Sequence, residues 1–594
     1  MDNSRNLLLA FVLSGLLILG WDVGMNYFYP QPEVTEEQST PPGGPATAAG
    51  VANAEDVSVG AGDLGAGASE GSPVDLDAAI ADPQRVAIDA PRIAGSINLV
   101  GARIDDIVLK DHQETVAKDS GPVRLFAPER TPTQYFAEFG FLANAQRSSS
   151  SALWAADGAK LTPDTPVTLT RTDGNLAYAI KLSVDDNYMI TAEQSVTNTA
   201  EEGAAVIQPF ALINRTSLNA TPDEFLSHAG PVGVFDEVLN DPNSYDELVE
   251  LRTWSPSGSP DWFGFSDRYW LGALVPSEGA DTTTFRSLGD NLFRADVLYT
   301  AETLAAGATL SKETRLYAGA KESAILDTYE EAGIAQFGKA ISWGWFEIIE
   351  KPLLWLLRSL NSLIGNFGVA IIGMTFLIRG MLFPIAQRQF ASMAQMKAVQ
   401  PKMKAIQERY KDDKQTQQQK IMELYKEEKV NPLAGCLPLL IQIPIFFALY
   451  KVLILSIEMR HEPFLYITDL TAPDPATFLN AFGLLDFQVA GTLFGIGVLA
   501  VLLGITMWLT FKLNPSAMDP MQQQIFNLMP WFLMFVMAPF AAGLLLYWVT
   551  SNILTLAQQK YLYSRHPQLK AAAEKEKAEM AQKAEREKAE KSKA

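Results

Sequence analysis

Long apolar runs recur along the second half of the chain, and their lengths predict membrane-spanning helices. A transmembrane helix needs about 20 mostly apolar residues, and four separate stretches between residues 366 and 563 supply that length. The last of them, Ile525–Tyr563, is 39 residues long and contains Pro530 and Pro539, so it is too long for one helix and fits two short ones. The predicted spans are residues 366–386, 432–457, 488–511, 525–540 and 541–562.

Basic residues flank these spans unevenly and set the expected orientation. Two helices within Ile525–Tyr563 place the tail, with Arg565 and Lys570, on the same side as the basic segment 387–431, whereas one helix would separate them. Because Lys and Arg concentrate in cytoplasmic loops, the two-helix arrangement is favoured. The pattern then predicts a periplasmic loop at 458–487, a cytoplasmic loop at 512–524 and a charged cytoplasmic tail at 563–594.

A further apolar segment, residues 7–19, follows Arg5 at the start of the chain. No small-x-small cleavage pattern comes after it, since a Gly-Trp-Asp triplet follows instead. An uncleaved signal anchor over residues 1–29, with a cytoplasmic N-terminus, is therefore favoured over a removed signal peptide. This anchor brings the predicted number of spans to six.

Three different patterns lie between the anchor and the next span. Residues 30–85 are rich in Pro, Gly, Ala and Ser and in acidic residues, with Arg85 as the only base, which predicts a flexible acidic linker. Residues 86–340 contain short alternating segments such as VTLTRT and YAIKLSV between turn residues, which predicts an antiparallel β-sandwich. Residues 341–365 interrupt their apolar positions with charges, as is typical of an amphipathic helix lying in the membrane interface.

The charged segment 387–431 has an apolar stripe on each side of a polar turn. Its stripes recur at steps of three and four residues and consist of Met393, Met396, Val399, Met403, Ile406 and Tyr410, then Ile421, Leu424 and Tyr425. This spacing predicts an antiparallel helical hairpin. The methionines either fill the seam of the hairpin or form an adaptable surface for partners.

Composition restricts the chemistry of the chain. Its 594 residues are 48% hydrophobic, and the formal net charge of −21 argues against a nucleic-acid binder as a whole. Cys436 is the only cysteine, which excludes an intrachain disulfide and a multi-cysteine metal cluster. The four histidines are scattered and no G-x-S-x-G, H-E-x-x-H or phosphate-loop motif occurs, so we expect no enzyme, no cofactor and no metal site. The tail mixes Lys and Glu, which indicates a solvated extension whose bases could contact acidic lipids or ribosomal RNA.

One ionisable residue inside a predicted span is the strongest candidate for function. Arg379 lies five residues before Pro384, about 7–8 Å deep if Pro384 marks the cytoplasmic surface. An arginine at this depth either snorkels to the phosphates or lines a wet cavity between helices. Thr375 lies four residues earlier on the same helical face. Polar positions in the other spans favour the cavity, and they are Gln442, Thr506, Thr550, Ser551, Asn552, Thr555, Gln558 and Gln559.

The segments TFLIRGMLFP, SMAQMKAVQPKMKAIQERYKDDKQ and ELYKEEKVNPLAGCLPLLIQIPIFFALY resemble the YidC/Oxa/Albino family of membrane insertases, in its Gram-negative form with a large periplasmic domain. The resemblance runs from about Trp345 to about Tyr563. It implies a bacterial inner-membrane protein with six spans, five of them forming the core, a periplasmic β-sandwich and a cytoplasmic hairpin. The implied function is to insert newly synthesised membrane proteins, and to help them fold, through a hydrophilic groove open to the cytoplasm.

The resemblance also implies partners and functional residues. The partners are nascent membrane proteins, the ribosome, the Sec translocon and membrane lipids. The resemblance implies Arg379 and Thr375 as groove residues. We add Gln442 as a third because its side chain is polar. The substrate slide is Ile443, Phe446, Tyr547 and Trp548, although Trp548 departs from the Tyr-Tyr pair expected of the family.

Two other classes of function remain open from the sequence. A solute transporter or channel with an extracytoplasmic sensory domain predicts solute flux in liposomes. An envelope carbohydrate-active enzyme predicts that the isolated 86–318 region turns over a sugar. The insertase interpretation predicts neither.

Overall fold

The computed structural model describes residues 64, 72–117, 119–147, 151–218, 220, 228–241, 244–289, 291–387, 399, 402–403, 405–411, 413–428, 437–477, 479–483, 495–513 and 520–565. These residues form two compact units. The β-rich unit holds the described residues up to 112 and from 122 to 340, and the helical unit holds 113–121 and those from 341 onward. The predicted signal anchor 1–29 and nearly all of the predicted tail lie outside the described residues.

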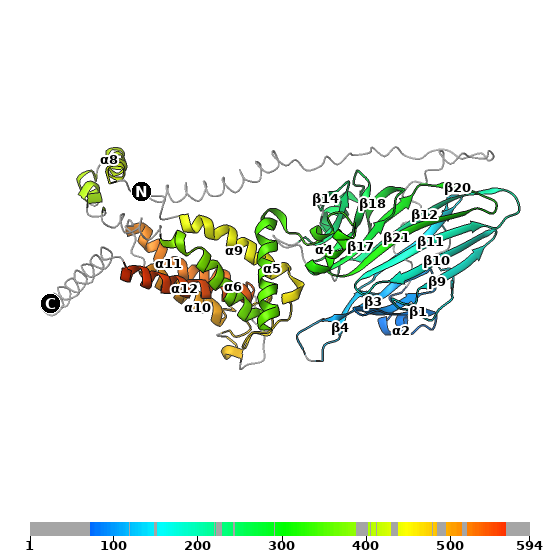
Figure 1. The fold of residues 1–594 in the computed structure, drawn as a ribbon, viewed down its shortest axis with the longest axis horizontal. Coiled ribbons are helices and arrows are strands. Elements are labelled where there is room, and N and C mark those ends of the chain that lie inside the picture. Colours follow the sequence, from blue (N-terminus) through cyan, green and yellow to red (C-terminus); the bar gives the residue numbers. More distant parts are fainter. Residues whose placement is uncertain are drawn as a thin grey trace. The chain divides into compact units, whose positions relative to one another are not determined.

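The β-rich unit consists of two sheets (Figure 1). In order across the first sheet, the strands are β15 (Thr253–Trp254), β18 (Ala280–Gly289), β19 (Leu292–Tyr299), β12 (Ala204–Thr216), β5 (Tyr135–Ala143), β3 (Arg103–Gln113), β2 (Ile93–Asn98), β1 (Arg85–Asp89) and β8 (Lys160–Leu161). Three more strands pair with members of this sheet: β20 (Glu302–Ala305) with β12, β4 (Pro122–Phe126) with β3, and β6 (Gln146–Arg147) with β5. The second sheet runs β14 (Val238–Asn240), β13 (Gly230–Phe235), β16 (Pro260–Ser266), β17 (Trp270–Pro276), β21 (Thr309–Ala320), β11 (Met189–Asn198), β10 (Leu176–Val184), β9 (Val167–Asp173) and β7 (Ala155–Ala156).

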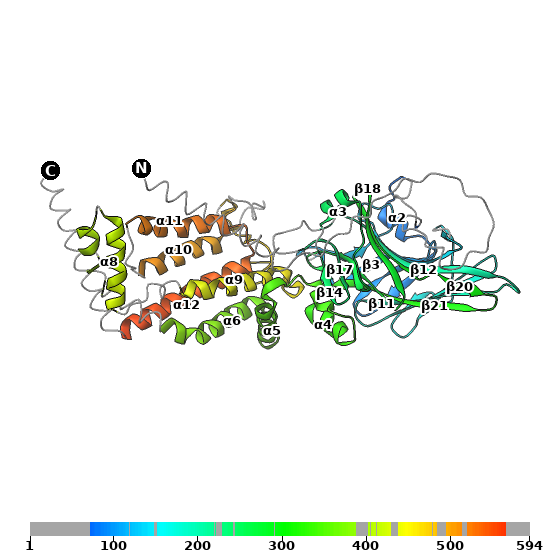
Figure 2. The ribbon, with the colours of Figure 1, turned by 90° about the horizontal axis from the view of Figure 1, so that it is seen from above.

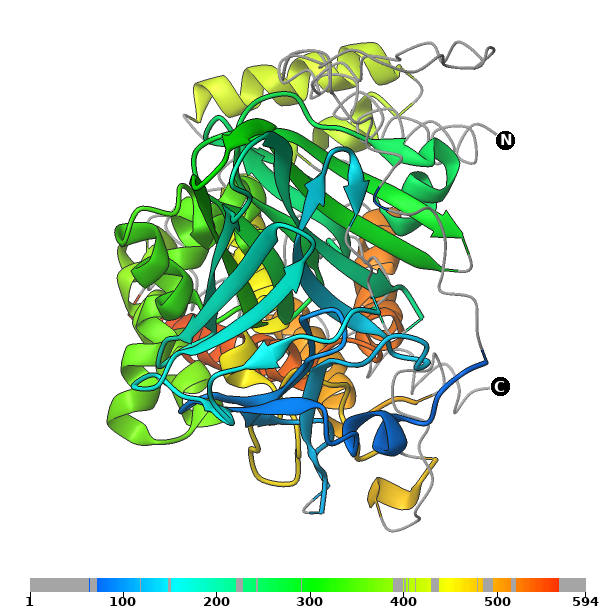
Figure 3. The ribbon, with the colours of Figure 1, turned by 90° about the vertical axis from the view of Figure 1, so that its right-hand side faces the viewer.

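The two sheets face each other as a sandwich, whose strands overlie one another in Figure 3. The long central pairs β10–β11, β11–β21 and β5–β12 are antiparallel, while β1 and β8 are parallel. Burial alternates along β10 and β11, and the inward residues Ile180, Leu182 and Ala192 are 1% exposed or less. The period-two pattern of the sequence therefore produces the β-rich domain that it predicts.

Short helices complete the β-rich unit, and the first of them corrects the predicted extent of the linker. They are α2 (Leu76–Ile80), α3 (Tyr245–Leu251), α4 (Ser323–Glu331) and the 3-10 helix η2 (Phe337–Ala340). Asp75 caps α2 by accepting a hydrogen bond from Ala78 N at 3.2 Å, and Val74 N donates to Arg130 O at 3.1 Å. The prediction of a flexible linker through residue 85 is therefore wrong for its last residues, because a capped helix and β1 begin there.

The helical unit is built from one crossing helix and a bundle. Its elements are η3 (Gly344–Phe346), α5 (Glu347–Ile364), α6 (Phe367–Met381), α8 (Lys414–Glu427), α9 (Leu437–Leu455), η5 (Ile457–Met459), η6 (Ala481–Gly483), α10 (Val498–Leu513), α11 (Pro520–Met537) and α12 (Ala542–Arg565). Figures 1 and 2 show α6 and α9–α12 running side by side, with α5 lying across them. The central helix is α12, which packs against α6, α9 and α10. Among the described helices, none combines the length and the apolar character needed to span a bilayer.

The segment that follows α9 joins several helix ends at one end of the bundle. Its hydrogen bonds run from Asn366 Nδ2 to Pro463 O (3.1 Å), from Leu499 N to Asp474 Oδ2 (2.8 Å) and from Ala542 N to Ala472 O (2.8 Å). The amino ends of α6, α10 and α12 therefore meet here. The carboxyl ends of α9 and α11 lie at the same end, because α9 leads directly into this segment and Ala541, just after α11, bridges to Pro473. Successive helices of the bundle thus run in alternating directions.

Two helix boundaries differ from the predicted spans. We expected a span from residue 488, but residues 495–497 are not helical, Gly497 forms a bridge with Thr477, and α10 begins at Val498. The cause is tertiary, since Asp474 caps this end of α10. By contrast, α11 begins earlier than predicted, at Pro520 inside the predicted loop 512–524. Proline suits the first turn of a helix.

Two further elements match their sequence patterns. The amphipathic α5 buries Leu353, Leu354 and Leu357 and exposes Ile348, Trp355 and Leu363. In the segment 387–431, α8 packs through Leu424 against Val399 and Met403, with Ile406, Ile421 and Tyr425 around them. These apolar residues are those of the two predicted stripes, so part of each stripe is a packing seam.

Candidate functional site

The central helix α12 carries polar side chains into the middle of the bundle. Tyr547, Ser551 and Asn552 are 2%, 1% and 8% exposed. Residues four positions apart lie above one another on a helix, so Tyr547 and Ser551 share one face and Asn552 lies beside them. Because α12 contacts three helices, each of these side chains can meet a different neighbour.

Arg379 of α6 meets α12 at Ser551. Its Nε donates to Ser551 Oγ at 3.0 Å, and a second guanidinium nitrogen donates to the same oxygen. Further along α12, Gln558 Nε2 donates to the carbonyl oxygen of Arg379 at 3.4 Å. Arg379 is partly exposed, and no carboxylate pairs with it among the residues that the structure describes. A guanidinium carries five N–H donors, so this cation can still accept an anionic partner.

Two more side-chain hydrogen bonds connect α12 to the other helices. Gln442 Nε2 of α9 donates to the Tyr547 hydroxyl at 2.9 Å. Asn552 Nδ2 donates to Thr506 Oγ1 of α10 at 3.1 Å. We call the three linked pairs, Arg379–Ser551, Gln442–Tyr547 and Asn552–Thr506, the polar layer.

The polar layer lies far from the end at which the helix termini meet. Arg379 is twelve residues from the start of α6, Ser551 nine from the start of α12 and Thr506 eight from the start of α10. At 1.5 Å per residue these separations are about 12–18 Å along the helices. The bonds to Ser551 direct the guanidinium toward α12.

The other predicted groove residue, Thr375, is not joined to Arg379 by a described hydrogen bond. It is fully buried, and its Oγ1 donates to Ile371 O of its own helix at 2.7 Å. This bond satisfies the hydroxyl within α6. Thr375 therefore lies one turn from Arg379 as a packed residue, whereas Gln442 joins the polar layer directly.

The four predicted slide residues lie in different surroundings. Phe446 of α9 and Trp548 of α12 contact each other, with ring centroids 4.8 Å apart. Ile443 is 42% exposed on α9. Tyr547 instead points into the bundle and belongs to the polar layer. An apolar surface thus follows Ile443, Phe446 and Trp548 beside the layer, without Tyr547.

Sequence reasoning did not single out Ser551 as the partner of Arg379. Ser551 was one of several polar positions in the last span, and these could not be ranked. The available signal was its four-residue spacing from Tyr547, which places both on one helix face. Within the described residues, no group of His, Cys, Asp and Glu side chains could hold a metal ion.

Two family models match the chain from residue 85 to residue 570, except for residues 357–358. The model described as the 60Kd inner membrane protein matches residues 359–570, and that of the YidC periplasmic domain matches residues 85–356. Curated relatives named membrane protein insertase YidC include those from Beijerinckia indica subsp. indica and Zymomonas mobilis subsp. mobilis. Each is 40% identical over 95% of this chain, covering 96% and 95% of the relative.

A solved structure described as an active YidC insertase with its first transmembrane domain resolved also matches. It is 18% identical, covers 82% of this chain and 94% of the other, and superposes with a TM-score of 0.35. The sequence matches favour the insertase interpretation over the solute transporter and the carbohydrate-active enzyme. Both halves of the chain match models of one family, and its relatives agree over nearly their full length, so the chain belongs to the YidC family of membrane protein insertases.

Proposed function

We propose that the polar layer receives the hydrophilic flank of a newly synthesised membrane protein, and that Arg379 is the cation that attracts it. A hydrophilic groove, open to the cytoplasm, would let the flank enter partway without a continuous aqueous pore. The single observation that carries this proposal is the bonding of Arg379 to Ser551 inside the bundle, about 18 Å along α6 from its amino end. A cation at that level draws an acidic flank into the membrane region more strongly than one at a head group.

The orientation that we propose has six spans, with the N-terminus and the C-terminus in the cytoplasm and the β-sandwich in the periplasm. The alternating directions of α6, α9, α10, α11 and α12 support it. With the common end at the periplasmic surface, the segment 387–431 and the tail both fall on the cytoplasmic side. Their basic residues then agree with the distribution of Lys and Arg around membrane spans.

The apolar part of the client would leave the groove beside α9 and α12. Ile443, Phe446 and Trp548 offer an apolar surface next to the polar layer, so a client can place its polar flank and its apolar segment at the same time. Partition of that segment into lipid supplies the driving force, because each buried CH₂ group contributes about 0.8 kcal/mol. No nucleotide is needed for this step.

The short α6 makes the proposed path shorter. Its 15 residues are about 22 Å long, less than the hydrocarbon thickness of about 30 Å. A bilayer adjusts to a short span by thinning locally. We therefore propose that the membrane is thinner beside α6, where Arg379 would bind the client.

We propose the ribosome and the Sec translocon as partners that deliver or share clients. The hairpin 387–431 and the basic tail are the segments on the proposed cytoplasmic side that a ribosome would meet. On α8, Met422 is 53% exposed and lies among glutamines, an adaptable surface for such a contact.

Insertion of clients with acidic and with neutral flanks tests the role of Arg379. We expect Arg379→Ala to reduce insertion of the acidic client by about tenfold or more, the worth of one charged hydrogen bond, and to affect the neutral client less. Arg379→Lys should retain part of the activity, because it keeps the charge but not the planar fork of donors. Ribosome-bound nascent chains should also crosslink to residues in 432–457 and 541–562.

The control is Arg358→Ala, which removes an arginine from α5 in the same unit but outside the polar layer. Equal insertion of both clients by the parent, Arg379→Ala and Arg358→Ala would leave Arg379 with no role in client binding.

A further inference from the structure

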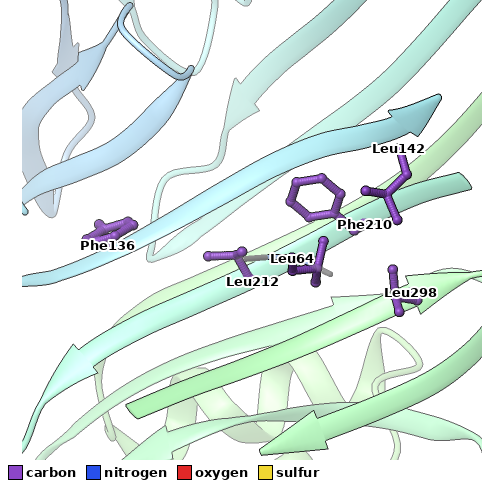
Figure 4. Packing of buried hydrophobic residues seen from close by; sticks show 6 residues of the cluster. All are labelled: Leu64, Phe136, Leu142, Phe210, Leu212 and Leu298. Carbon is purple, nitrogen blue, oxygen red and sulfur yellow. The ribbon is translucent and has the colours of Figure 1, made fainter. Parts of the chain in front are cut away.

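Leu64 is an isolated apolar residue in the acidic linker. It is the only leucine, isoleucine, methionine or aromatic residue between Pro30 and Asp75, and it lies within the sequence GAGDLGAG. Its side chain is nevertheless only 1% exposed. Leu64 belongs to an apolar cluster with five residues of the β-rich unit, which Figure 4 shows around it.

The five residues come from three adjacent strands of the first sheet. Phe136 and Leu142 lie on β5, Phe210 and Leu212 on β12, and Leu298 on β19. The register places Phe210 opposite Leu298 and opposite Gly140, so these positions lie on one face of the sheet. We call this cluster of five the Leu64 pocket.

The Leu64 pocket lies on the outer face of the sandwich. Phe141, one position away on β5, contacts Tyr178 of the second sheet, with ring centroids 5.2 Å apart. Because successive side chains of a strand point to opposite faces, Leu142 and Gly140 point away from the second sheet. A set of apolar side chains on an outer sheet face needs a cover, and Leu64 supplies it.

Gly140 gives the pocket its shape. A Cβ at this position would lie 2.5 Å from Cζ of Phe210, so only glycine lets that ring lie across β5. The ring then forms one wall of the pocket against which an aliphatic side chain can pack.

Two arginines bind the backbone of the residue that fills the pocket. A terminal nitrogen of Arg147 donates to the carbonyl oxygen of Leu64, and Arg294 donates to the same oxygen at 3.3 Å. Other groups hold both arginines in place: Arg147 donates to Glu138 Oε1 at 2.6 Å, and Arg294 donates to Asn214 Oδ1 at 2.9 Å. Since every residue has a carbonyl oxygen, this contact does not depend on a particular sequence.

We propose that the Leu64 pocket is a binding site for a polypeptide segment with one aliphatic anchor side chain between small residues, and that Leu64 occupies it in cis as a ligand that such a peptide can displace. The pocket admits the anchor, and the two arginines hold the adjoining carbonyl. A ligand tethered within the same chain can have an effective concentration in the millimolar range, so Leu64 competes strongly with a peptide at micromolar concentration. The proposal is independent of the polar layer and of Arg379.

Fluorescence anisotropy of a labelled peptide tests this site. The probe is the 13-residue linker sequence SVGAGDLGAGASE, residues 58–70, added to the full chain in nanodiscs. We expect the Leu64→Asp chain, whose pocket is vacant, to bind the probe at least tenfold more tightly than the parent. A probe with Asp in place of its leucine should not bind, and Arg147→Gln in the Leu64→Asp chain should weaken binding about tenfold.

The matched control is Val59→Asp, which adds the same charge to the linker and leaves Leu64 in place; it should behave as the parent. If Leu64→Asp does not fold, Leu64→Ala takes its place. Thermal unfolding of the β-rich unit checks that the variant is folded. Equal probe binding by the parent and the Leu64 variants, or equal binding of both probes, would overturn the proposal. So would a failure of the folded variants to bind the probe, or unfolding of both, since Leu64 would then be only part of the core.

Discussion

Replacing Ser551 with alanine separates the charge of Arg379 from its position. The substitution keeps the guanidinium and removes the hydroxyl that accepts two of its N–H groups. A hydrogen bond to a charged group contributes about 1.5–3 kcal/mol, so two would contribute about 3–6 kcal/mol if nothing replaced them. Arg379 is partly exposed, however, and water can take over the freed donors.

Side-chain hydrogen bonds within membrane bundles average about 0.6 kcal/mol and reach about 1.7 kcal/mol. We therefore expect Ser551→Ala to lower the free energy of unfolding by about 1–2 kcal/mol, and not by the full sum. A double-mutant cycle with Arg379→Met, followed by unfolding of the full chain in bicelles, measures the coupling between the two side chains. Insertion of an acidic-flank client by Ser551→Ala should stay within about threefold of the parent, because the charge remains.

Thr550→Ala is the matched control, since it removes a neighbouring hydroxyl from α12 that has no described hydrogen bond to Arg379. A coupling energy indistinguishable from that of the Thr550–Arg379 cycle would show that the Arg379–Ser551 bond does not form in the membrane. Equal loss of insertion by Ser551→Ala and Arg379→Met would mean that the arginine acts by its placement and not by its charge.

Three further predictions concern stability. Glu350 of α5 is fully buried, and neither of its carboxylate oxygens has a hydrogen-bond partner among the described residues, so burial raises its pKa to about 7. The folded state therefore loses stability as the pH rises from 4.5 through 7. In unfolding experiments, Glu350→Gln should leave the stability unchanged at pH 4.5 and raise it by about 1–3 kcal/mol at pH 8. Asp474→Ala removes a buried carboxylate that accepts hydrogen bonds from Leu499 N at 2.8 Å and from Ala476 N at 3.0 Å. The free energy of opening the first turn of α10 should fall by about 2–3 kcal/mol. Amide hydrogen exchange should then be faster in that turn and unchanged in α12. Gly140→Ala forces a Cβ against Phe210 and should destabilise the β-rich unit by about 1–3 kcal/mol in thermal unfolding, whereas Gly121→Ala, which meets no atom within 4 Å, should not.

The sequence determined the elements of this protein, because their patterns depend on neighbouring residues. Period-two alternation identified the strands of the β-rich unit, charges among apolar positions identified α5, and apolar steps of three and four residues identified the packing seam of α8. The break near Pro539 separated α11 from α12. Arg379 could be recognised because a charge within an apolar run is costly wherever the run is placed.

Only the tertiary structure decided which residues meet, because those choices depend on how distant segments pack. Arg379 and Ser551 are 172 positions apart, and the packing of α6 on α12 selected Ser551 from several polar neighbours. The start of α10 depends on Asp474, which lies outside that helix. The role of Leu64 is likewise invisible in a linker of glycine, alanine and acidic residues, since its pocket exists only when β5, β12 and β19 lie side by side and an outer sheet face must be shielded from water.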